Sequence, residues 1–279
     1  MESLGYYNGK FGPVEEVMIP FNDRVHFFGD GVYDATNATN GKILFIDEHI
    51  DRFFSSAKLL RIDLPYTKEE LKSILYEMLS KVDSDINFVY WQQTRGTAPR
   101  NHAFQDVPSN LWIMIKPAKL KPYDELIKLT DMEDHRFEYC NIKTLNLIPS
   151  VLAAQKAEEE GCDECVFHRG ENVTECAHSN ISIIKDGIFR THPLDNHILP
   201  GIARAHLIKA CKANYIPVDE TIFTMDELRD ADEVIVSSSS NFCMIAGTLN
   251  GKPIGGKDHE TLMKIQNYVV QEYHEYCGI

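Results

Sequence analysis

Residues 140–147 read CNIKTLNL and place one charged side chain, Lys143, inside an otherwise uncharged run. Pro149 suits the first turn of a helix and Gly161 suits a helix end, so a helix is predicted between them. A lysine amine that is partly desolvated loses some of its charge and can attack a carbonyl carbon. On these residues alone, the preferred interpretation is a lysine at a helix start that keeps its amine in water, because desolvated lysines are less common. The rest of the chain decides between the two interpretations.

The composition limits the classes of protein to which the chain can belong. Its 279 residues are 43% hydrophobic and 25% charged, which suits one large or two ordinary globular domains. The net charge of −14 disfavours nucleic acid and anionic membranes as partners. No apolar run approaches the roughly 20 residues of a membrane span, and no secretory signal pattern is visible at the N-terminus. We therefore expect a cytoplasmic protein.

The seven cysteines are irregularly spaced and odd in number, so a disulfide framework is not expected. Cys162 and Cys165 form a lone CxxC motif without a second pair of ligands, which gives a zinc site little support. We expect reduced, structural thiols and no bound metal.

The first half of the chain predicts alternating strands and helices. Thr67 and Glu70 form a capping box that opens one amphipathic helix, and Asp47 is expected to cap another that ends near Arg61. Strands are predicted at residues 1–21, 32–36, 86–93 and 111–115. A turn is predicted at residues 8–9 and a hairpin at residues 40–41. A polar and basic loop, residues 94–102, follows one of these strands and is of the kind that carries function.

Residues 116–123 contain three lysines and two prolines, which is typical of a linker. We therefore predict an N-terminal domain of residues 1–118 and a second domain of residues 119–279. In the second half, Asp186-Gly187 predicts a hairpin, and residues 202–214 predict a helix.

Four further features have a chemistry that goes with Lys143. They are Glu175, the helix start at residues 201–203, the hydroxyl pair Ser238 and Ser239, and Arg52. A carboxylate can hold a proton on a pyridine nitrogen, which makes that ring an electron sink. Free amides at a helix start, hydroxyls and an arginine all suit a phosphate group. Each feature alone also fits an ordinary surface position, but together they are compatible with a pyridoxal phosphate site.

The order of these pieces resembles the fold type IV aminotransferases, and within them the enzymes that act on D-amino acids. The resemblance covers nearly the whole chain. It is carried by residues 28–33 (FGDGVY), 48–52 (EHIDR), 94–100 (TRGTAPR), 142–146 (IKTLN), 173–175 (VTE) and 199–202 (LPGI). It implies an α/β fold with a small N-terminal α/β domain, a larger C-terminal β-rich α/β domain and the site between them.

The resemblance also implies a role for each candidate residue. Lys143 would hold pyridoxal 5'-phosphate as a Schiff base and move the substrate Cα proton, while Glu175 would pair with the pyridine nitrogen. The phosphate would be bound by Arg52, the amides of Ile202 and Ala203, Ser238 and Ser239, and Leu199 would pack on the ring. The substrate carboxylate would be held by Tyr33, Arg100 and His102, partly lent by the second subunit of a homodimer.

The sequence departs from the family pattern at three places. Cys176, Ala177 and His178 replace a glycine and serines, Ala203 replaces a threonine, and Ser238 and Ser239 stand for threonines. These changes leave the cofactor assignment intact but affect the predicted substrate range. A contact of His178 with the substrate stays an open alternative to a histidine that is simply hydrogen-bonded.

The sequence thus predicts a dimeric transaminase that moves an amino group between a D-amino acid and a 2-oxo acid. The alternatives on the same scaffold are a branched-chain L-amino acid aminotransferase and an aminodeoxychorismate-type lyase. A cofactor-binding protein without turnover is a third alternative. Tyr33 with the Arg100-x-His102 pair favours the D-specific enzyme, and the presence of Lys143 and Glu175 disfavours the inert protein.

Overall fold

The computed structural model describes residues 3–279, whose contacts divide into two compact units. The first unit runs to Leu120 and also includes Ile142–Asn146 and Tyr276–Ile279. The second consists of Lys121–Asn141 and Leu147–Glu275. The segment that carries Lys143 therefore belongs to the first unit, although its neighbours in the chain belong to the second. The predicted division after residue 118 stays a prediction, because contacts do not say which parts fold on their own.

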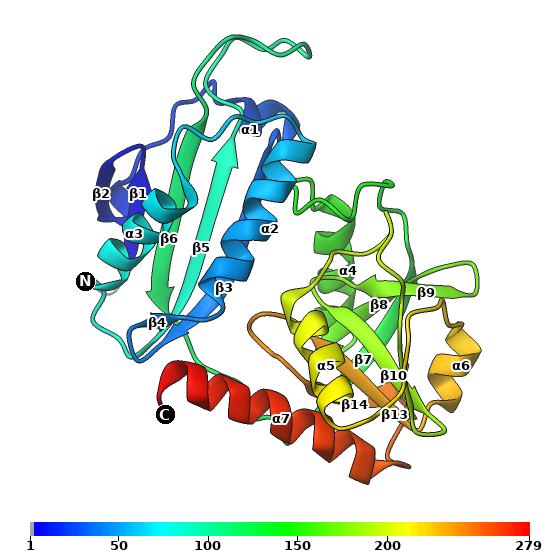
Figure 1. Ribbon diagram of the computed structural model, residues 1–279. Coiled ribbons are helices and arrows are strands. Elements are labelled where there is room, and N and C mark those ends of the chain that lie inside the picture. The colour runs from blue at the N-terminus through cyan, green and yellow to red at the C-terminus, as the bar shows by residue number, and fades with distance from the viewer. Residues whose placement is uncertain (1–2) are drawn as a thin grey trace. The chain divides into compact units, whose positions relative to one another are not determined.

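The first unit is built on a six-stranded antiparallel sheet in the order β2-β1-β6-β5-β3-β4. Its strands are β1 (Leu4–Tyr7), β2 (Lys10–Pro13), β3 (Gly31–Thr39), β4 (Lys42–Ile43), β5 (Ile86–Thr94) and β6 (Asn110–Pro117). Its helices are the 3-10 turn η1 (Val14–Glu16), α1 (Arg24–Phe28), α2 (Ile46–Leu59) and α3 (Lys68–Leu79). Helices α2 and α3 cover one face of this sheet (Figure 1).

The amphipathic pattern of α2 and α3 explains why they lie on the sheet. Phe53 of α2, Leu71 of α3 and Trp91 of β5 are fully buried in one apolar core, and each such side chain contributes about 1.5–3 kcal/mol by leaving water. The capping box of α3 is confirmed, since Thr67 and Glu70 each accept the other's backbone N–H. The cap predicted for α2 is wrong: Phe45, in a left-handed conformation, is the N-cap, and Asp47 lies in the first turn.

The second unit is built on a mixed nine-stranded sheet in the order β12-β11-β10-β13-β14-β7-β8-β9, with β15 paired to β14. Its strands are β7 (Leu126–Glu133), β8 (Glu164–Arg169), β9 (Asn172–Cys176), β10 (Asn180–Lys185), β11 (Ile188–Thr191), β12 (Val218–Asp219), β13 (Glu233–Ser237), β14 (Met244–Leu249) and β15 (Lys252–Pro253). Its helices are α4 (Ile148–Glu159), α5 (Ile202–Ala213), α6 (Met225–Asp230) and α7 (His259–Cys277), whose end reaches into the first unit.

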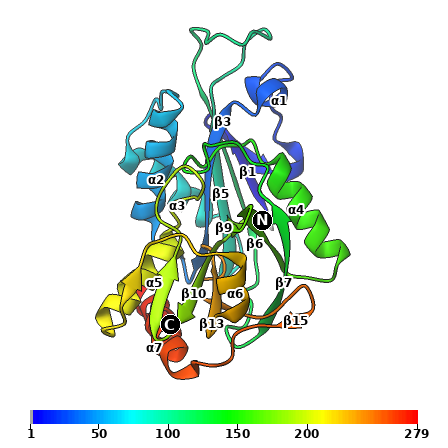
Figure 2. The ribbon, with the colours of Figure 1, turned by 90° about the vertical axis from the view of Figure 1, so that its right-hand side faces the viewer.

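Parallel pairing distinguishes this sheet from the first. Strand β7 runs parallel to both β8 and β14, and the β7-to-β8 connection contains α4, which packs on these strands (Figure 2). A crossover of this kind is what two parallel neighbours require. The hairpin predicted at Asp186-Gly187 joins β10 to β11 and is confirmed, as are the helices predicted after Pro149 and Gly201. Helix α7 was not predicted.

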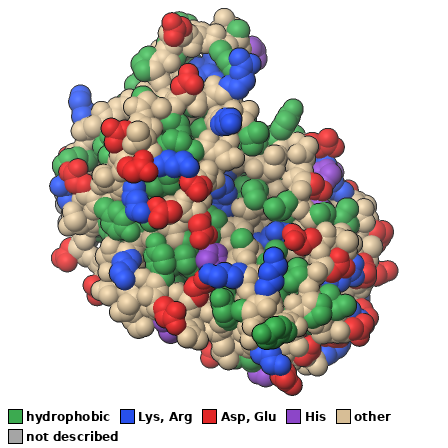
Figure 3. Space-filling view, in the orientation of Figure 1, with side chains coloured by type: hydrophobic (Ala, Val, Ile, Leu, Met, Phe, Trp, Pro, Cys, Tyr) green, Lys and Arg blue, Asp and Glu red, His purple; other side chains and the backbone are tan. Residues whose placement is uncertain are grey.

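Charged side chains of both signs lie on the surface, and most of the cysteines are buried. Acidic and basic side chains are interspersed over the face drawn in Figure 3. All seven cysteines are free, and five of them are buried. Within residues 3–279, no helix has both the length and the apolar character needed to cross a bilayer.

Candidate active site

Lys143 lies on a short segment that is hydrogen-bonded to strand β3. The amide of Tyr33 donates to the carbonyl of Lys143 at 2.9 Å, and the amide of Leu145 donates to the carbonyl of Gly31 at 3.1 Å. The amide of Lys143 donates to Ser56 Oγ of α2 at 3.2 Å. The backbone is therefore fixed on both sides of the lysine. Its Nζ atom lies 4.3 Å from the centroid of the Tyr33 ring, a cation–π contact that directs the amine.

Arg52 belongs to a buried ion-pair network next to this lysine. Asp34 of β3, whose side chain is 0% exposed, accepts from Arg52 Nε at 2.9 Å and from Arg52 Nη2 at 2.7 Å. His49 Nδ1 lies 2.8 Å from Asp34 Oδ1. A bidentate contact of this kind fixes the plane of a guanidinium group. The interpretation of Arg52 as a solvated surface charge is wrong, since its side chain is 8% exposed.

The electrostatics of this network follow from burial and pairing. Burial opposes ionisation of Asp34, but the Arg52 charge and the hydrogen bonds from His49 and Arg52 outweigh it and hold the Asp34 pKa far below its usual range. Burial lowers the pKa of His49 despite the Asp34 charge. His49 is therefore neutral, and Nδ1 is the nitrogen that carries the proton donated to Asp34. Its Nε2 atom has no hydrogen-bond partner among the described residues.

Arg100 and His102 lie in the exposed loop between β5 and β6, also in the first unit. The Arg100 guanidinium carbon is 5.2 Å from the centroid of the Phe28 ring, and the His102 ring is 5.0 Å from the same ring. Within residues 3–279, Arg100 takes part in no ion pair, although the chain has an excess of carboxylates. Two predicted carboxylate-binding side chains thus share one aromatic support.

Glu175, at the end of β9 in the second unit, is held by three different groups. Its Oε2 atom accepts from Asn180 Nδ2 at 2.9 Å and from the amide of Leu199 at 3.0 Å. Its Oε1 atom accepts a short hydrogen bond from Arg136 Nη1. Donors of this kind favour the carboxylate form of a glutamate. The structure thus brings Glu175 and Leu199 together, as expected for two residues that contact one ring.

Arg136 is a residue that the sequence analysis missed. Its Nη2 atom donates to Asp134 Oδ2 at 2.9 Å and to the carbonyl of His197 at 3.0 Å, and its guanidinium carbon lies 4.6 Å from the Phe167 ring centroid. Burial opposes its charge, but Glu175 and Asp134 outweigh burial and raise the pKa of Arg136. The signal available in the sequence was the pair of opposite charges spaced two apart in an extended segment, which is common on surfaces.

The start of helix α5 has no side-chain cap, because its N-cap residue is Gly201. A Cβ atom at this position would lie 1.8 Å from Asn180 Oδ1, so only glycine fits. The next residues, Ile202 and Ala203, are buried. An uncapped helix start offers its first amides to an anion.

Ser238 and Ser239 lie in the turn between β13 and β14. Ser238 Oγ is 3.2 Å from Ser240 Oγ, and the amide of Ser238 donates to the carbonyl of Asn241 at 2.9 Å. The turn is therefore closed by backbone bonds, with its hydroxyls grouped together. Both serines are partly exposed.

Three of the residues that depart from the family pattern, Cys176, Ala177 and His178, lie at the end of β9 and in the tight turn that leads to β10. Cys176 and Ala177 are buried, whereas the His178 side chain is 61% exposed. His178 Nδ1 lies 3.1 Å from an oxygen of the buried Glu164, which also accepts from Ser179 Oγ at 2.9 Å. His178 therefore has a protein partner, and a substrate contact stays a prediction.

His192, Asp195 and His197 offer ligand atoms that all lie within 4.8 Å of one another. His192 Nδ1 lies 2.9 Å from the carbonyl of Pro193, so this nitrogen carries a proton. We assign no metal to this group, and the expected absence of a metal stays a prediction.

Each unit, taken by itself, offers groups that suit part of a pyridine ring that carries a phosphate and an aldehyde. The first unit supplies a primary amine and a guanidinium oriented by Asp34. The second supplies a carboxylate held by three donors and a helix start with free amides. These are the groups that bind an aldehyde, a phosphate and a protonated pyridine nitrogen.

Comparison with known proteins agrees with this chemistry. Residues 31–246 match the amino-transferase class IV family, and the chain belongs to this family. The membership confirms the predicted family and the aminotransferase activity.

Curated relatives cover almost the whole chain. A D-alanine aminotransferase from Listeria monocytogenes is 40% identical over 271 residues, which span 95% of this chain and 94% of the relative. A D-alanine aminotransferase from Staphylococcus haemolyticus is 40% identical over 255 residues, 90% of each chain.

Solved structures with little sequence identity share the fold. A branched-chain aminotransferase from Thermoproteus uzoniensis superimposes with a TM-score of 0.89 at 21% identity, over 99% of this chain and 95% of the other. A putative 4-amino-4-deoxychorismate lyase from Legionella pneumophila gives 0.85 at 23% identity, over 93% and 97%. The predicted fold class is thereby confirmed. At this identity, the likeness shows the fold alone.

Proposed function

We propose that the protein transfers an amino group between a D-amino acid and a 2-oxo acid with pyridoxal 5'-phosphate as cofactor. The observation that carries the proposal is the near-complete coverage by curated relatives named D-alanine aminotransferase at about 40% identity. Class IV aminotransferases use this cofactor, and the groups described above in each unit suit parts of it.

Each predicted cofactor residue has a task that its surroundings support. Lys143 would hold the aldehyde carbon through Nζ, and its amine would move the proton at the substrate Cα. Arg52, held in plane by Asp34, binds the phosphate together with the amides of Ile202 and Ala203 and the hydroxyls of Ser238 and Ser239. Glu175 keeps a proton on the ring nitrogen, and Leu199 covers one ring face. When bound, the pyridine ring supplies an electron sink for the bond that breaks at Cα.

The substrate carboxylate is assigned to Arg100, His102 and Tyr33. Arg100 presents a planar pair of donors that matches a carboxylate, and an arginine without an ion-pair partner within residues 3–279 suits a charged ligand. Holding the carboxylate at a fixed place determines which enantiomer directs its Cα–H bond toward Lys143. This is our basis for preferring D-amino acids over the branched-chain L-amino acids.

The oligomeric state and the compartment are further parts of the proposal. We propose a homodimer, with the carboxylate-binding loop partly lent by the second subunit, and a cytoplasmic enzyme. The mass of the holoenzyme in solution tests the dimer directly.

Stopped-flow absorbance of the cofactor tests the substrate class. D-Alanine should convert the pyridoxal form to the pyridoxamine form much faster than L-alanine or L-leucine. Arg100→Leu should lose most of that preference, because removing a charged donor costs about 2–4 kcal/mol in the transition state. Lys143→Ala is the control that should give no conversion. Faster reaction of the parent with L-leucine would favour a branched-chain L-aminotransferase, and release of pyruvate from aminodeoxychorismate would favour the lyase.

A further inference from the structure

The loop that carries Arg100 and His102 rests on a buried arginine to which no function has been assigned so far. Arg24, 2% exposed, lies in the short helix α1 and points its guanidinium at three successive backbone carbonyls of the loop. Arg24 Nη1 donates to the carbonyl of Asn101 at 2.5 Å and to that of Ala103 at 3.4 Å. Arg24 Nη2 donates to the carbonyl of His102 at 3.4 Å. One side chain therefore holds the backbone immediately after Arg100.

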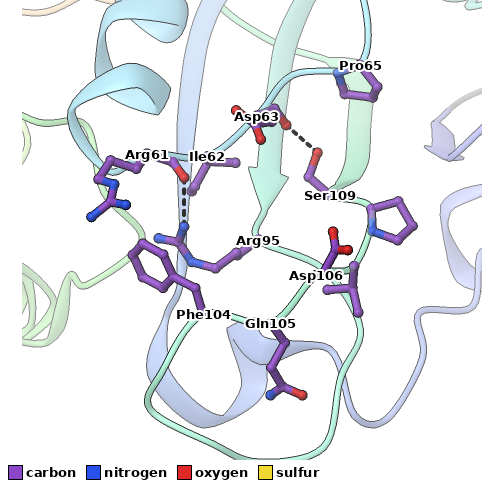
Figure 4. A pocket seen from close by; sticks show the side chains of 11 residues that line it. Arg61, Ile62, Asp63, Pro65, Arg95, Phe104, Gln105, Asp106 and Ser109 are labelled. Atoms are coloured by element: carbon purple, nitrogen blue, oxygen red, sulfur yellow. Dashed lines mark hydrogen bonds between the residues drawn. The ribbon is translucent and has the colours of Figure 1, made fainter.

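A second arginine holds the next residue of the loop. The guanidinium carbon of Arg95 lies 3.7 Å from the centroid of the Phe104 ring, and Figure 4 shows the two side chains next to each other. Arg95 also donates to the carbonyls of Arg61 at 2.9 Å and Leu60 at 2.8 Å, at the C-terminal end of α2. Phe104 is 53% exposed, so contact with Arg95, and with Arg61 at 5.2 Å, fixes its position rather than burial.

Asp30 joins the two arginines. Its carboxylate accepts from Arg24 Nε at 2.8 Å and from Arg95 Nε at 2.9 Å. Because each Nε atom is bound to Asp30, the plane of each guanidinium is fixed and its remaining N–H groups are directed at the loop and at α2. We call Asp30, Arg24 and Arg95 the loop anchor.

The rest of the loop has little apolar support. A cavity of about 490 Å³ lies between residues 61–65 and residues 104–109 (Figure 4). Residues 99–104 are all exposed. The stems of the loop, in contrast, touch closely, since a Cβ atom at Gly96 (φ +124°) would lie 2.3 Å from the carbonyl oxygen of Pro108. Between these stems, the loop anchor acts together with two hydrogen bonds within the loop, from Gln105 Nε2 to the carbonyl of Pro99 at 2.8 Å and from the amide of Ala103 to Asn101 Oδ1 at 3.2 Å.

We propose that Arg24 is a positioning residue for substrate binding, which acts with Asp30 and Arg95 by fixing the loop that presents Arg100 and His102. The inference rests on the proposed role of these two side chains at the substrate carboxylate. Arg24 itself does not bind the substrate. Its phenylalanine neighbour, Phe28, supports the inference, because Arg24, Arg100 and His102 all lie against that one ring, with Arg24 at 5.0 Å.

Trypsin tests the anchoring without any reference to activity. The bond after Arg100 needs local loosening of the loop before a protease can bind it. In the holoenzyme of Arg24→Met, cleavage after Arg100 should become about tenfold faster or more, since the three carbonyl contacts are lost. Arg229→Met, a change at an exposed helix position, is the matched control and should leave this rate as in the parent. An unchanged rate in Arg24→Met would overturn the inference.

The kinetic test separates the carboxylate from the rest of the substrate. Misplacing a binding group by about 1 Å can cost up to about 100-fold, so KM for D-alanine should rise about 10- to 100-fold in Arg24→Met. KM for D-alaninamide, in which an amide replaces the carboxylate, should change little. Arg24→Lys keeps the charge but cannot reach Asp30 and three carbonyls together, so it should resemble Arg24→Met. An equal rise for both substrates would contradict a role through Arg100.

Phe104→Ala is a second test variant that should fold even if Arg24→Met does not, because Phe104 is exposed. Losing its contact with Arg95 should raise KM for D-alanine about 2- to 5-fold and speed cleavage in the same direction. No change in either quantity would count against the loop anchor.

If Arg100→Leu leaves KM for D-alanine unchanged, the proposed carboxylate site is wrong. If Arg100→Leu raises KM but Arg24→Met changes neither KM nor cleavage, the inference about Arg24 alone is wrong.

Discussion

The two units of the chain each contain a buried arginine–carboxylate pair. The residue proposed to contact the cofactor is the arginine in the first unit and the carboxylate in the second. In the first unit, fully buried Asp34 fixes Arg52 by a bidentate contact. In the second, Arg136 is fixed by fully buried Asp134 and holds Glu175. The same interaction therefore prepares a cation for a phosphate in one place and an anion for a ring nitrogen in the other.

The two networks differ in which charged group, more exposed than the buried aspartate, is proposed to contact the cofactor. Asp34 and Arg52 form a pair with a neutral His49 beside it, so the network is balanced. Arg136 lies between Asp134 and Glu175, and Arg169 Nε is 3.3 Å from the same Asp134, so two guanidinium groups face two carboxylates and this network is balanced as well. In the first network the guanidinium of Arg52 is 8% exposed and Asp34 is fully buried, whereas in the second the carboxylate of Glu175 is 8% exposed and Asp134 is fully buried. The surroundings of each pair thus decide which charge it can offer to a ligand.

Removing the middle charge of the second network should have the largest effect. Arg136→Met leaves Glu175 without its cationic partner and Asp134 with Arg169 alone, and removing one partner of a buried pair lowers the free energy of unfolding by about 3–5 kcal/mol. Denaturant unfolding of the holoenzyme measures this. Glu175→Gln, in contrast, removes one carboxylate and should keep more stability while slowing Cα proton removal about 100-fold or more. Equal stability of the two variants would show that Arg136 is not needed to compensate the Glu175 charge.

Changes in the first network should lower cofactor retention as well as stability, because Asp34 is fully buried. Arg52→Ala removes a charged hydrogen-bond donor, which is worth about 1.5–3 kcal/mol or roughly 10- to 150-fold in cofactor affinity. Asp34→Asn keeps Arg52 but weakens its bidentate support, so it should act in the same direction with a smaller loss. Equilibrium dialysis followed by absorbance measures both. Full retention of the cofactor by Arg52→Ala would contradict a phosphate contact and leave only a structural pair.

The smallest expected effect is a pH dependence that comes from His49. Its pKa is lowered in the folded protein below the ordinary value of 6.5, so the unfolded chain binds a proton that the folded chain does not. Stability from this group is present above pH 6.5 and is lost as the pH falls from 6.5 toward the folded pKa, by about 1.4 kcal/mol for each pH unit between the two values.

His49→Gln keeps a donor for Asp34 but cannot titrate, so its unfolding free energy should depend less on pH below 6.5. His259→Gln, at an exposed position, is the matched control and should keep the slope of the parent. An identical slope in all three proteins would mean that His49 is not the group that couples pH to stability.

Local chemistry explains what was predictable in this chain. The capping box at Thr67, the hairpin at Asp186-Gly187 and the helix after Pro149 are determined by residues a few positions apart. The cap of α2 was mispredicted because Phe45 adopts a left-handed conformation, which tertiary packing imposes and no propensity indicates. Helix α7 went unnoticed in the sequence.

The sequence by itself determined the kinds of group in the candidate site: an amine at Lys143, a carboxylate at Glu175, an uncapped helix start at Gly201 and an arginine at position 52. Only the tertiary structure decided how these groups are held. Asp34 binds Arg52 across 18 positions of the chain, Arg136 binds Glu175 across 39, and Arg24 binds the loop across 77. Contacts between residues so far apart follow from how strands and helices pack. No local pattern specifies them, because the residues next to an arginine in the sequence do not reveal whether its side chain is buried or exposed.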